Sequence, residues 1–267
     1  MTKKILEIRK PRSTDQNTCP FSLGKMRVVP LFEPLQIARD KRKIARQLKD
    51  AFEKFIAKET EFSPTYATDR KVKFRPCYSE AEEAIKGIGY SAKDVENFSL
   101  SVSIIRGESC FSHHLGLFLS ALINHGRDSD YIIHTRHFKG NPPDCLGLLN
   151  TKNILVKGKA GMWLGEFMKD GSIVCTGSAY GGVANGMDGG SILVKGKVGE
   201  GSAQYMRGGT LTIKKGINER FYDYHGFGAF SEEIATVYIK GGNLPGVRVL
   251  SELKLYYKGK IVPNDTY

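Results

Sequence analysis

The chain has 267 residues, of which 40% are hydrophobic and 25% are charged, and its formal net charge is +12 at neutral pH. This length is enough for one large domain or two smaller ones with a buried core. No apolar run is long enough to span a bilayer, and the first residues lack the apolar stretch of a secretory signal. The five cysteines are dispersed and form no C-x-x-C pair, so we expect a cytoplasmic protein without a disulfide framework.

Much of the positive charge lies in residues 1–60. Positive charge can attract nucleic acids or acidic proteins, but alone it identifies no specific function. The sequence has neither the cysteine and histidine spacing of a zinc finger nor an aromatic RNA-binding motif. It therefore does not favour a nucleic-acid-binding protein.

Residues 1–129 are predicted to form a mixed N-terminal region that is rich in helices. A strand-like run, MRVVPLF, is followed by a helix that is predicted to begin at Pro34. Its apolar residues, from Ile37 to Ile56, recur at helical spacing and form one stripe, whereas the opposite face is charged. This pattern is typical of a helix that packs on a core and leaves one face in solvent.

Further elements are predicted between residues 79 and 138. Two capping boxes, Ser79–Glu82 and Ser91–Asp94, each predict a helix start. The run Phe98–Ile105 alternates between polar and apolar residues and indicates a strand, and Asp130–Phe138 indicates another. His114–Asn124 is apolar on all sides, which indicates a buried helix. We expect this helix to close the N-terminal end of the domain that follows.

Residues 154–210 consist of three copies of one nineteen-residue pattern. Each copy contains alternating apolar residues and a glycine, then a variable turn, then Met-x-Gly-Gly followed by Ser or Thr. The repeated positions form structural columns: Gly158, Gly177 and Gly196; Met168, Met187 and Met206; and Gly171, Gly190 and Gly209. Short alternating strands with glycine corners at this period are typical of a parallel β-solenoid, in which each turn lies on the preceding one.

The alternation also predicts which residues face inward. One apolar ladder runs through Ile154 and a second through Val156, each with its equivalents one period apart. The residues between them face outward. Lysines share two of the outward columns: Lys157, Lys195 and Lys214 in one, and Lys159 and Lys197 in the other. These columns are interpreted as a solvated face or as a binding surface for an acidic partner.

The ends of the solenoid depart from the pattern. Residues 135–153 read as a degenerate first coil, with Leu149 at the place of Met168. From Leu211 to Val237 the period is extended by a seven-residue insertion. Residues 217–233 are rich in aromatic side chains, which indicates an interface or a cap over the end of the stack.

The Met-x-Gly-Gly and Gly-x-Ala-Gly columns resemble the GXGXG-motif domain, which forms the C-terminal part of the glutamate synthase large (alpha) subunit. They are also similar to the C subunit of formylmethanofuran dehydrogenase. The resemblance covers residues 154–213 strongly and about 130–246 weakly. It implies a right-handed parallel β-helix with a structural role in an assembly. Glutamate synthase activity is not expected, because no cysteine follows the initiator methionine and the chain has no room for a flavin-binding barrel.

Five histidines lie close together in the sequence, near one cysteine and two aspartates: His113, His114, His125, His134 and His137. Imidazole, thiolate and carboxylate groups could together hold zinc or iron. Cys110 and His113 could also act as nucleophile and base, with Asp128 orienting the imidazole. The spacing fits neither a known zinc motif nor a defined triad, so surface and capping roles are the other interpretation.

We therefore expect a mainly β chain in which residues 1–129 form a helical N-terminal region. Residues 130–267 are expected to form a single-stranded right-handed parallel β-helix of nineteen-residue coils, capped by an α/β segment. The expected function is a non-catalytic scaffold or protein-interaction subunit of a larger complex, without a cofactor. The alternative is an enzyme or a ligand- or metal-binding protein whose site lies where residues 105–137 meet the β-helix. The expected partners are proteins, including further copies of the chain, rather than nucleic acid or a membrane.

Overall fold

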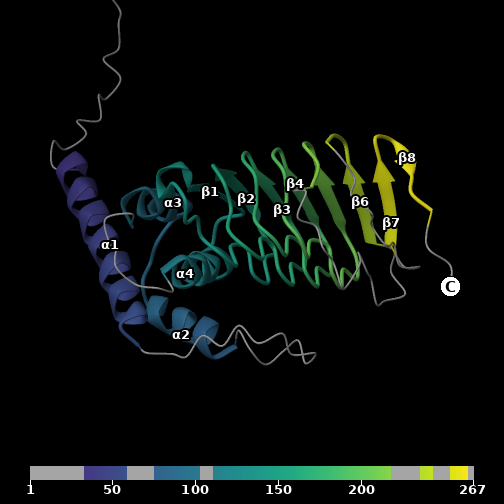
Figure 1. Cartoon of the computed structure of the whole chain (residues 1–267). Helices are drawn as coiled ribbons and strands as arrows, with labels where there is room; N and C mark the ends of the chain where they lie inside the picture. The colour runs from purple at the N-terminus through teal and green to yellow at the C-terminus, as the bar shows by residue number, and fades with distance from the viewer. Residues whose placement is uncertain (1–32, 59–74, 103–110, 218–234, 243–252, 264–267) are drawn as a thin grey trace, which may run out of the picture.

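The computed structural model describes residues 33–58, 75–102, 111–217, 235–242 and 253–263. Within these ranges a row of parallel strands follows a group of helices, and the last strand turns back antiparallel (Figure 1). The strands are β1 (Asp130–His134), β2 (Asn153–Lys157), β3 (Ser172–Cys175), β4 (Ser191–Val194), β5 (Thr210–Ile213), β6 (Ala235–Ile239), β7 (Leu253–Tyr257) and β8 (Lys260–Ile261). Their order in the sheet is their order in the chain. This is the predicted parallel β-solenoid, with about five turns of about 19 residues.

The strands pair in the register that the repeat predicts. Ile154 pairs with Ile173, and the ladder continues through Ile192 to Leu211. Leu211 pairs with Val237, which confirms the predicted insertion between β5 and β6. Successive side chains of a strand point to opposite faces, so every second position faces the interior. All five of these side chains are at most 2% exposed.

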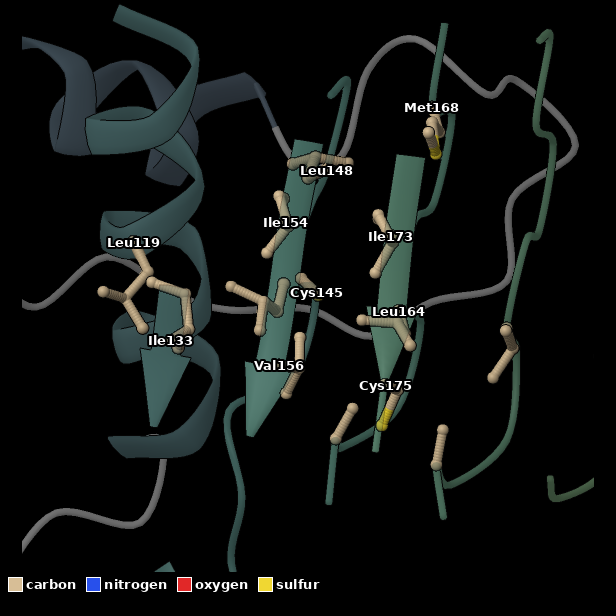
Figure 2. Close-up of a cluster of buried hydrophobic side chains, with 14 of the residues drawn as sticks. Leu119, Ile133, Cys145, Leu148, Ile154, Val156, Leu164, Met168, Ile173 and Cys175 are labelled. Carbon is tan, nitrogen blue, oxygen red and sulfur yellow. The ribbon is translucent and has the colours of Figure 1, made fainter. Parts of the chain in front are cut away.

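A second inward ladder lies beside the first. It runs through Val156, Cys175, Val194 and Ile213, which are all fully buried. Figure 2 shows Val156 and Cys175 together with Leu164, which comes from the segment that returns the chain from β2 to β3. Burying a Val, Leu or Ile side chain stabilises a fold by about 1.5–3 kcal/mol. The two ladders therefore make a continuous core along the solenoid.

The Met-x-Gly-Gly pattern has a packing explanation. Met168 and Met187 are fully buried. In the turn after Met168, Gly190 has a φ of 81°, and a Cβ atom there would lie 2.8 Å from Cε of Met168. Gly209 stands in the same relation to Met187, at 2.7 Å. Glycine is therefore required for two reasons: the backbone is left-handed, and the methionine of the preceding turn leaves no room for a side chain.

Another side of each turn is built from left-handed residues at alternate positions, which was not predicted. In one turn these are Trp163, Gly165 and Phe167, with φ of 58°, 70° and 50°. The N–H of Trp163 donates to the carbonyl of Gly181 in the next turn, and the N–H of Gly165 donates to Leu146 in the preceding turn. A left-handed backbone costs a non-glycine residue about 1–2 kcal/mol. The hydrogen bonds to both neighbouring turns hold the residues in it.

Four described helices precede the strands: α1 (Glu33–Ile56), α2 (Arg75–Ile85), α3 (Ala92–Ser101) and α4 (Phe111–His125). The predicted helices at Pro34 and His114 are thereby confirmed as α1 and α4. Phe52, on the apolar stripe of α1, is fully buried. Its ring centroid lies 5.1 Å from that of Phe118 on α4 and 5.7 Å from that of Phe98 on α3. Helices α1, α3 and α4 thus share one aromatic core.

Helix α4 closes the N-terminal end of the solenoid, as expected (Figure 1). Ser120 Oγ lies within donating distance of two carbonyl oxygens, of Gly116 at 2.7 Å and of Cys145 at 3.0 Å, and it accepts from the N–H of Gly147 at 2.9 Å. Asn124 Nδ2 donates to the carbonyl of Leu148 at 2.9 Å. Backbone groups at the open end of a stacked sheet need partners. The buried side of α4 supplies them with side-chain hydrogen bonds, which an apolar helix could not do.

One predicted element in the helical region is wrong. The expected strand Phe98–Ile105 is, over its described residues, the end of α3 and a short helical turn. The capping box at Ser91 is confirmed and starts α3. The helix places Val95, Phe98 and Val102 on one face, where all three are at most 3% exposed. The helical spacing of these three residues therefore outweighs the local alternation.

Two smaller predictions also differ from the structure. Helix α2 begins at Arg75, so Ser79 lies inside it and is not its N-cap. Strand β1 ends at His134 and a 3-10 helix, Arg136–Phe138, follows it. The strand predicted for Asp130–Phe138 is therefore confirmed only in its first half.

In the first coil, the predicted alignment with the repeat is wrong by one residue. Asn150, not Leu149, occupies the place of Met168, because its carbonyl accepts the equivalent hydrogen bonds from the next turn. Asn150 Nδ2 donates to the carbonyl of Lys152 at 2.7 Å, and Oδ1 accepts from the Lys152 N–H at 3.1 Å. This side-chain bridge makes the turn into β2 tighter. Leu149 is 36% exposed.

The strand-like run MRVVPLF and all of the aromatic segment 217–233 except Ile217 lie outside the described residues. Among the helices that the structure describes, none is both long enough and apolar enough to span a membrane.

Candidate functional site

The histidines predicted as metal ligands are separated in the structure. Three of them pair with three different carboxylates: His113 Nδ1 with Asp144 Oδ2 at 3.1 Å, His125 Nε2 with Glu82 Oε1 at 2.8 Å, and His134 Nε2 with Glu96 Oε1 at 2.9 Å. The other two, His114 and His137, pack against the rings of Phe55 and Phe138. Over the described ranges, no three His, Cys, Asp or Glu side chains are grouped to hold a metal ion. The structure therefore does not assemble this site.

The predicted nucleophile group is not assembled from the described residues either. Cys110 lies outside them. Asp128 accepts a hydrogen bond from the N–H of Ala92 at 2.5 Å, which places it at the start of α3. The carboxylate beside His113 is Asp144, so the assignment of Asp128 as its orienting acid is wrong. The contact between α4 and the first coil that brings Asp144 to His113 has no local sequence signal.

Asp144 joins α4 to the first two coils. Its Oδ2 accepts from Ser112 Oγ at 2.8 Å and contacts His113, and its Oδ1 accepts from the N–H of Met162 at 2.6 Å. Burial lowers the pKa of His113, although the carboxylate of Asp144 opposes this shift. The imidazole is therefore neutral at pH 7. The Ser112 hydroxyl donates to the carboxylate, so the Asp144 side chain fastens α4 to the coils.

Glu166 is a buried carboxyl group that sequence reasoning missed. It is 3% exposed, and burial raises its pKa to about 8, so it is mostly neutral at pH 7. Its Oε1 lies 3.5 Å from Nδ2 of Asn185, and its Oε2 is buried with no hydrogen-bond partner among the described residues. Glu166, Asn185 and Gln204 recur one period apart. This polar column is the signal that could have revealed the position.

A buried thiol, that of Cys145, feels the charge of Glu166. Cys145 is fully buried, and its pKa is raised well above its usual value, first by burial and then by the Glu166 and Asp144 carboxyl groups. A thiol in this state is protonated and unreactive. The Cys145 thiol is therefore part of the packed core of the first two coils.

The outer face of the sheet carries the most regular polar feature of the molecule. The strand position after Val156 recurs in each turn. Its occupants are His134, Lys157, Thr176, Lys195, Lys214, Lys240 and Lys258. Of its lysines, Lys157 is partly exposed and the other four are exposed. The sequence prediction included the first three lysines. We call these five lysines the lysine column.

A second outward column runs beside the lysine column, two residues earlier on each strand. Its first members are the aliphatic residues Ile132, Leu155, Val174 and Leu193, its last are Tyr238 and Tyr256, and Thr212 lies between the two groups. All are partly exposed. The rings of Tyr238 and Tyr256 are stacked, with centroids 5.0 Å apart. We call this set the apolar column, and the two columns together the outer sheet face.

The lysine column has no neutralising partner within the described part of the chain. The ion pairs found there involve other residues. Lys258 lies 4.9 Å from the ring centroid of Tyr257, which is a contact with a neutral group. Successive strands are about 4.8 Å apart, so neighbouring lysines repel one another. The second predicted lysine pair, Lys159 and Lys197, adds further exposed positive charge two residues on.

Comparison of the chain with protein-family models, with curated proteins and with solved structures found no match. On the outer sheet face, a column of cations lies along a column of apolar side chains.

Proposed function

We propose that the chain is a non-catalytic scaffold that binds a partner protein through its outer sheet face and so forms part of a larger complex. The observation that carries the proposal is the pairing of the two columns over successive turns of one rigid sheet. Partly exposed aliphatic side chains gain free energy when a partner covers them, and exposed charges beside them guide and orient the partner.

The solenoid suits this role because its outer surface presents side chains in regular columns. Each turn adds one residue to each outward column, so the face extends as long as the stack does. Extended surfaces of repeat proteins bind other macromolecules in this way. The resemblance of the Met-x-Gly-Gly columns to the GXGXG-motif domain supports the same role, since that domain is a structural element of a larger subunit.

The enzyme or metal-site alternative receives less support. Of the residues that would form its site, His113 contacts Asp144, whose other hydrogen bonds fasten α4 to the coils. His125 and His134 pair with carboxylates on α2 and α3. These contacts join the helices to one another and to the solenoid.

Co-purification from the native host tests the proposal. Leu193→Glu places a charge in the middle of the apolar column, whereas Leu100→Glu makes the same change at a leucine of α3 that is 48% exposed. We expect a stoichiometric partner with the wild type and with Leu100→Glu, and its loss with Leu193→Glu. Circular dichroism and thermal melting verify that both variants are folded. Retention of the partner by folded Leu193→Glu would reject the outer sheet face as the binding surface.

A further inference from the structure

The lysine column restricts the chemistry of the partner. It continues through Lys195, Lys214, Lys240 and Lys258 in four successive turns, and all four are exposed without an ion-pair partner among the described residues. Such a row concentrates positive potential along one line. Covering it with neutral groups would leave the ammonium groups desolvated and unpaired, which is costly. A partner that binds here must therefore carry a row of negative charges.

The adjacent apolar column distinguishes between kinds of polyanion. Leu155 and Leu193 lie two residues before Lys157 and Lys195, Val174 lies two residues before Thr176, and all three apolar residues are partly exposed. A polypeptide can present carboxylates to one column and apolar side chains to the other, because successive side chains of an extended chain point to opposite sides. A polynucleotide would neutralise the lysines but offers no aliphatic groups to these three residues.

The length of the column gives the length of the segment. From Lys157 to Lys258 the column makes five steps between strands, or about 24 Å at about 4.8 Å per step. An extended polypeptide covers this distance with about seven residues at about 3.3 Å each. About four of these would be acidic if every second side chain faces the lysines. The flexible lysine side chains can accommodate the difference between the two spacings.

Resting on the function proposed above, we infer that the outer sheet face binds an extended acidic segment of its partner, about seven residues long, with alternating carboxylate and apolar side chains. The segment lies along the solenoid axis and crosses the strands. Its carboxylates pair with the lysine column, and its apolar side chains lie along the apolar column, between Leu155 and Tyr256.

Fluorescence anisotropy with the full chain tests this inference. The probe is a labelled peptide, Glu-Val-Glu-Leu-Glu-Val-Glu, and the control peptide has Gln in place of each Glu. We expect binding of the acidic peptide only, weakened more than tenfold by Lys195→Gln/Lys214→Gln and weakened when salt is raised from about 50 to about 300 mM. The matched variant Lys54→Gln/Lys169→Gln removes the same charge from exposed lysines outside the column, and we expect it to bind as the wild type does.

Three outcomes would overturn the inference. Equal effects of the two double variants would show that only net charge matters. Binding of a labelled oligothymidylate but not of the acidic peptide, again lost in Lys195→Gln/Lys214→Gln, would assign the face to nucleic acid. Absence of peptide binding together with a native partner that still depends on Leu193 would reject the acidic segment and leave the scaffold function standing.

Discussion

Met168 packs its terminal methyl group against Gly190 of the next turn, at a backbone position where both a left-handed conformation and the absence of a side chain are needed. The same relation joins Met187 to Gly209. The methionine of one repeat therefore packs against a glycine of the next repeat. This explains why the methionine and glycine columns recur together at a constant spacing.

Gly190→Ala should destabilise the solenoid. The new Cβ would meet Cε of Met168 at 2.8 Å and the carbonyl of Gly171 at 2.7 Å, on a backbone with φ of 81°. We expect the free energy of unfolding to fall by about 2–4 kcal/mol, measured by urea denaturation. Gly89→Ala is the control, because nothing lies within 4 Å of the Cβ that it would add. Equal midpoints for the two variants would contradict the packing explanation.

Ser120→Ala should loosen α4 from the first coil. The hydroxyl accepts from the N–H of Gly147, which would lose its partner. It also lies 3.0 Å from the carbonyl of Cys145, which would keep the hydrogen bond from the N–H of Leu148. We expect a loss of about 1–3 kcal/mol in the free energy of unfolding, together with faster amide exchange at Gly147. Ser101→Ala removes a hydroxyl of α3 that, among the described residues, bonds within its own helix, and it serves as the control. Unchanged exchange at Gly147 would show that the helix does not cap the coil.

Glu166 should make stability fall as pH rises. Its pKa is raised from 4.5 to about 8 in the folded chain by burial, so between these values the unfolded chain has lost a proton that the folded chain retains. The stability associated with the neutral carboxyl is complete below about pH 4.5 and is lost progressively up to about pH 8. Glu166→Gln keeps a neutral side chain and should remove this loss.

The comparison is made by denaturation at a series of pH values. We expect Glu166→Gln to gain stability relative to the wild type between about pH 5 and 8, by up to about 4 kcal/mol. The neighbouring thiol of Cys145 also has a raised pKa, so Cys145→Ser in the same background separates its contribution. Asp170→Asn changes an exposed carboxylate near the end of the same turn and serves as the control. A pH-independent difference between wild type and Glu166→Gln would show that the carboxyl is ionised in the folded chain.

The solenoid could be predicted from the sequence because the residues that form its core recur at a constant spacing. The inward ladder from Ile154 to Leu211 follows directly from that period, and the pairing of Leu211 with Val237 follows once the insertion is counted. Lys240 and Lys258 could have been added to the lysine column in the same way, by extending the register past the insertion.

Other features depend on contacts that no local pattern records. Trp163 and Phe167 adopt left-handed backbones that their side chains disfavour, because hydrogen bonds to neighbouring turns hold them there. Asp144 reaches His113 only because α4 packs on the first coil. The start of α3 was correctly predicted from Ser91, but its continuation through Phe98 depends on burial against α1 and α4.

Site-specific photo-crosslinking in an extract of the native host tests the central claim, that the outer sheet face binds a partner protein. A photoreactive residue replaces Leu193 in the apolar column or, as the control, Leu149, which is 36% exposed on the left-handed side of the first coil. The account predicts one discrete protein adduct from position 193, abolished by excess unlabelled chain, and none from position 149. The same adducts from both positions, or an adduct from position 149 alone, would contradict it.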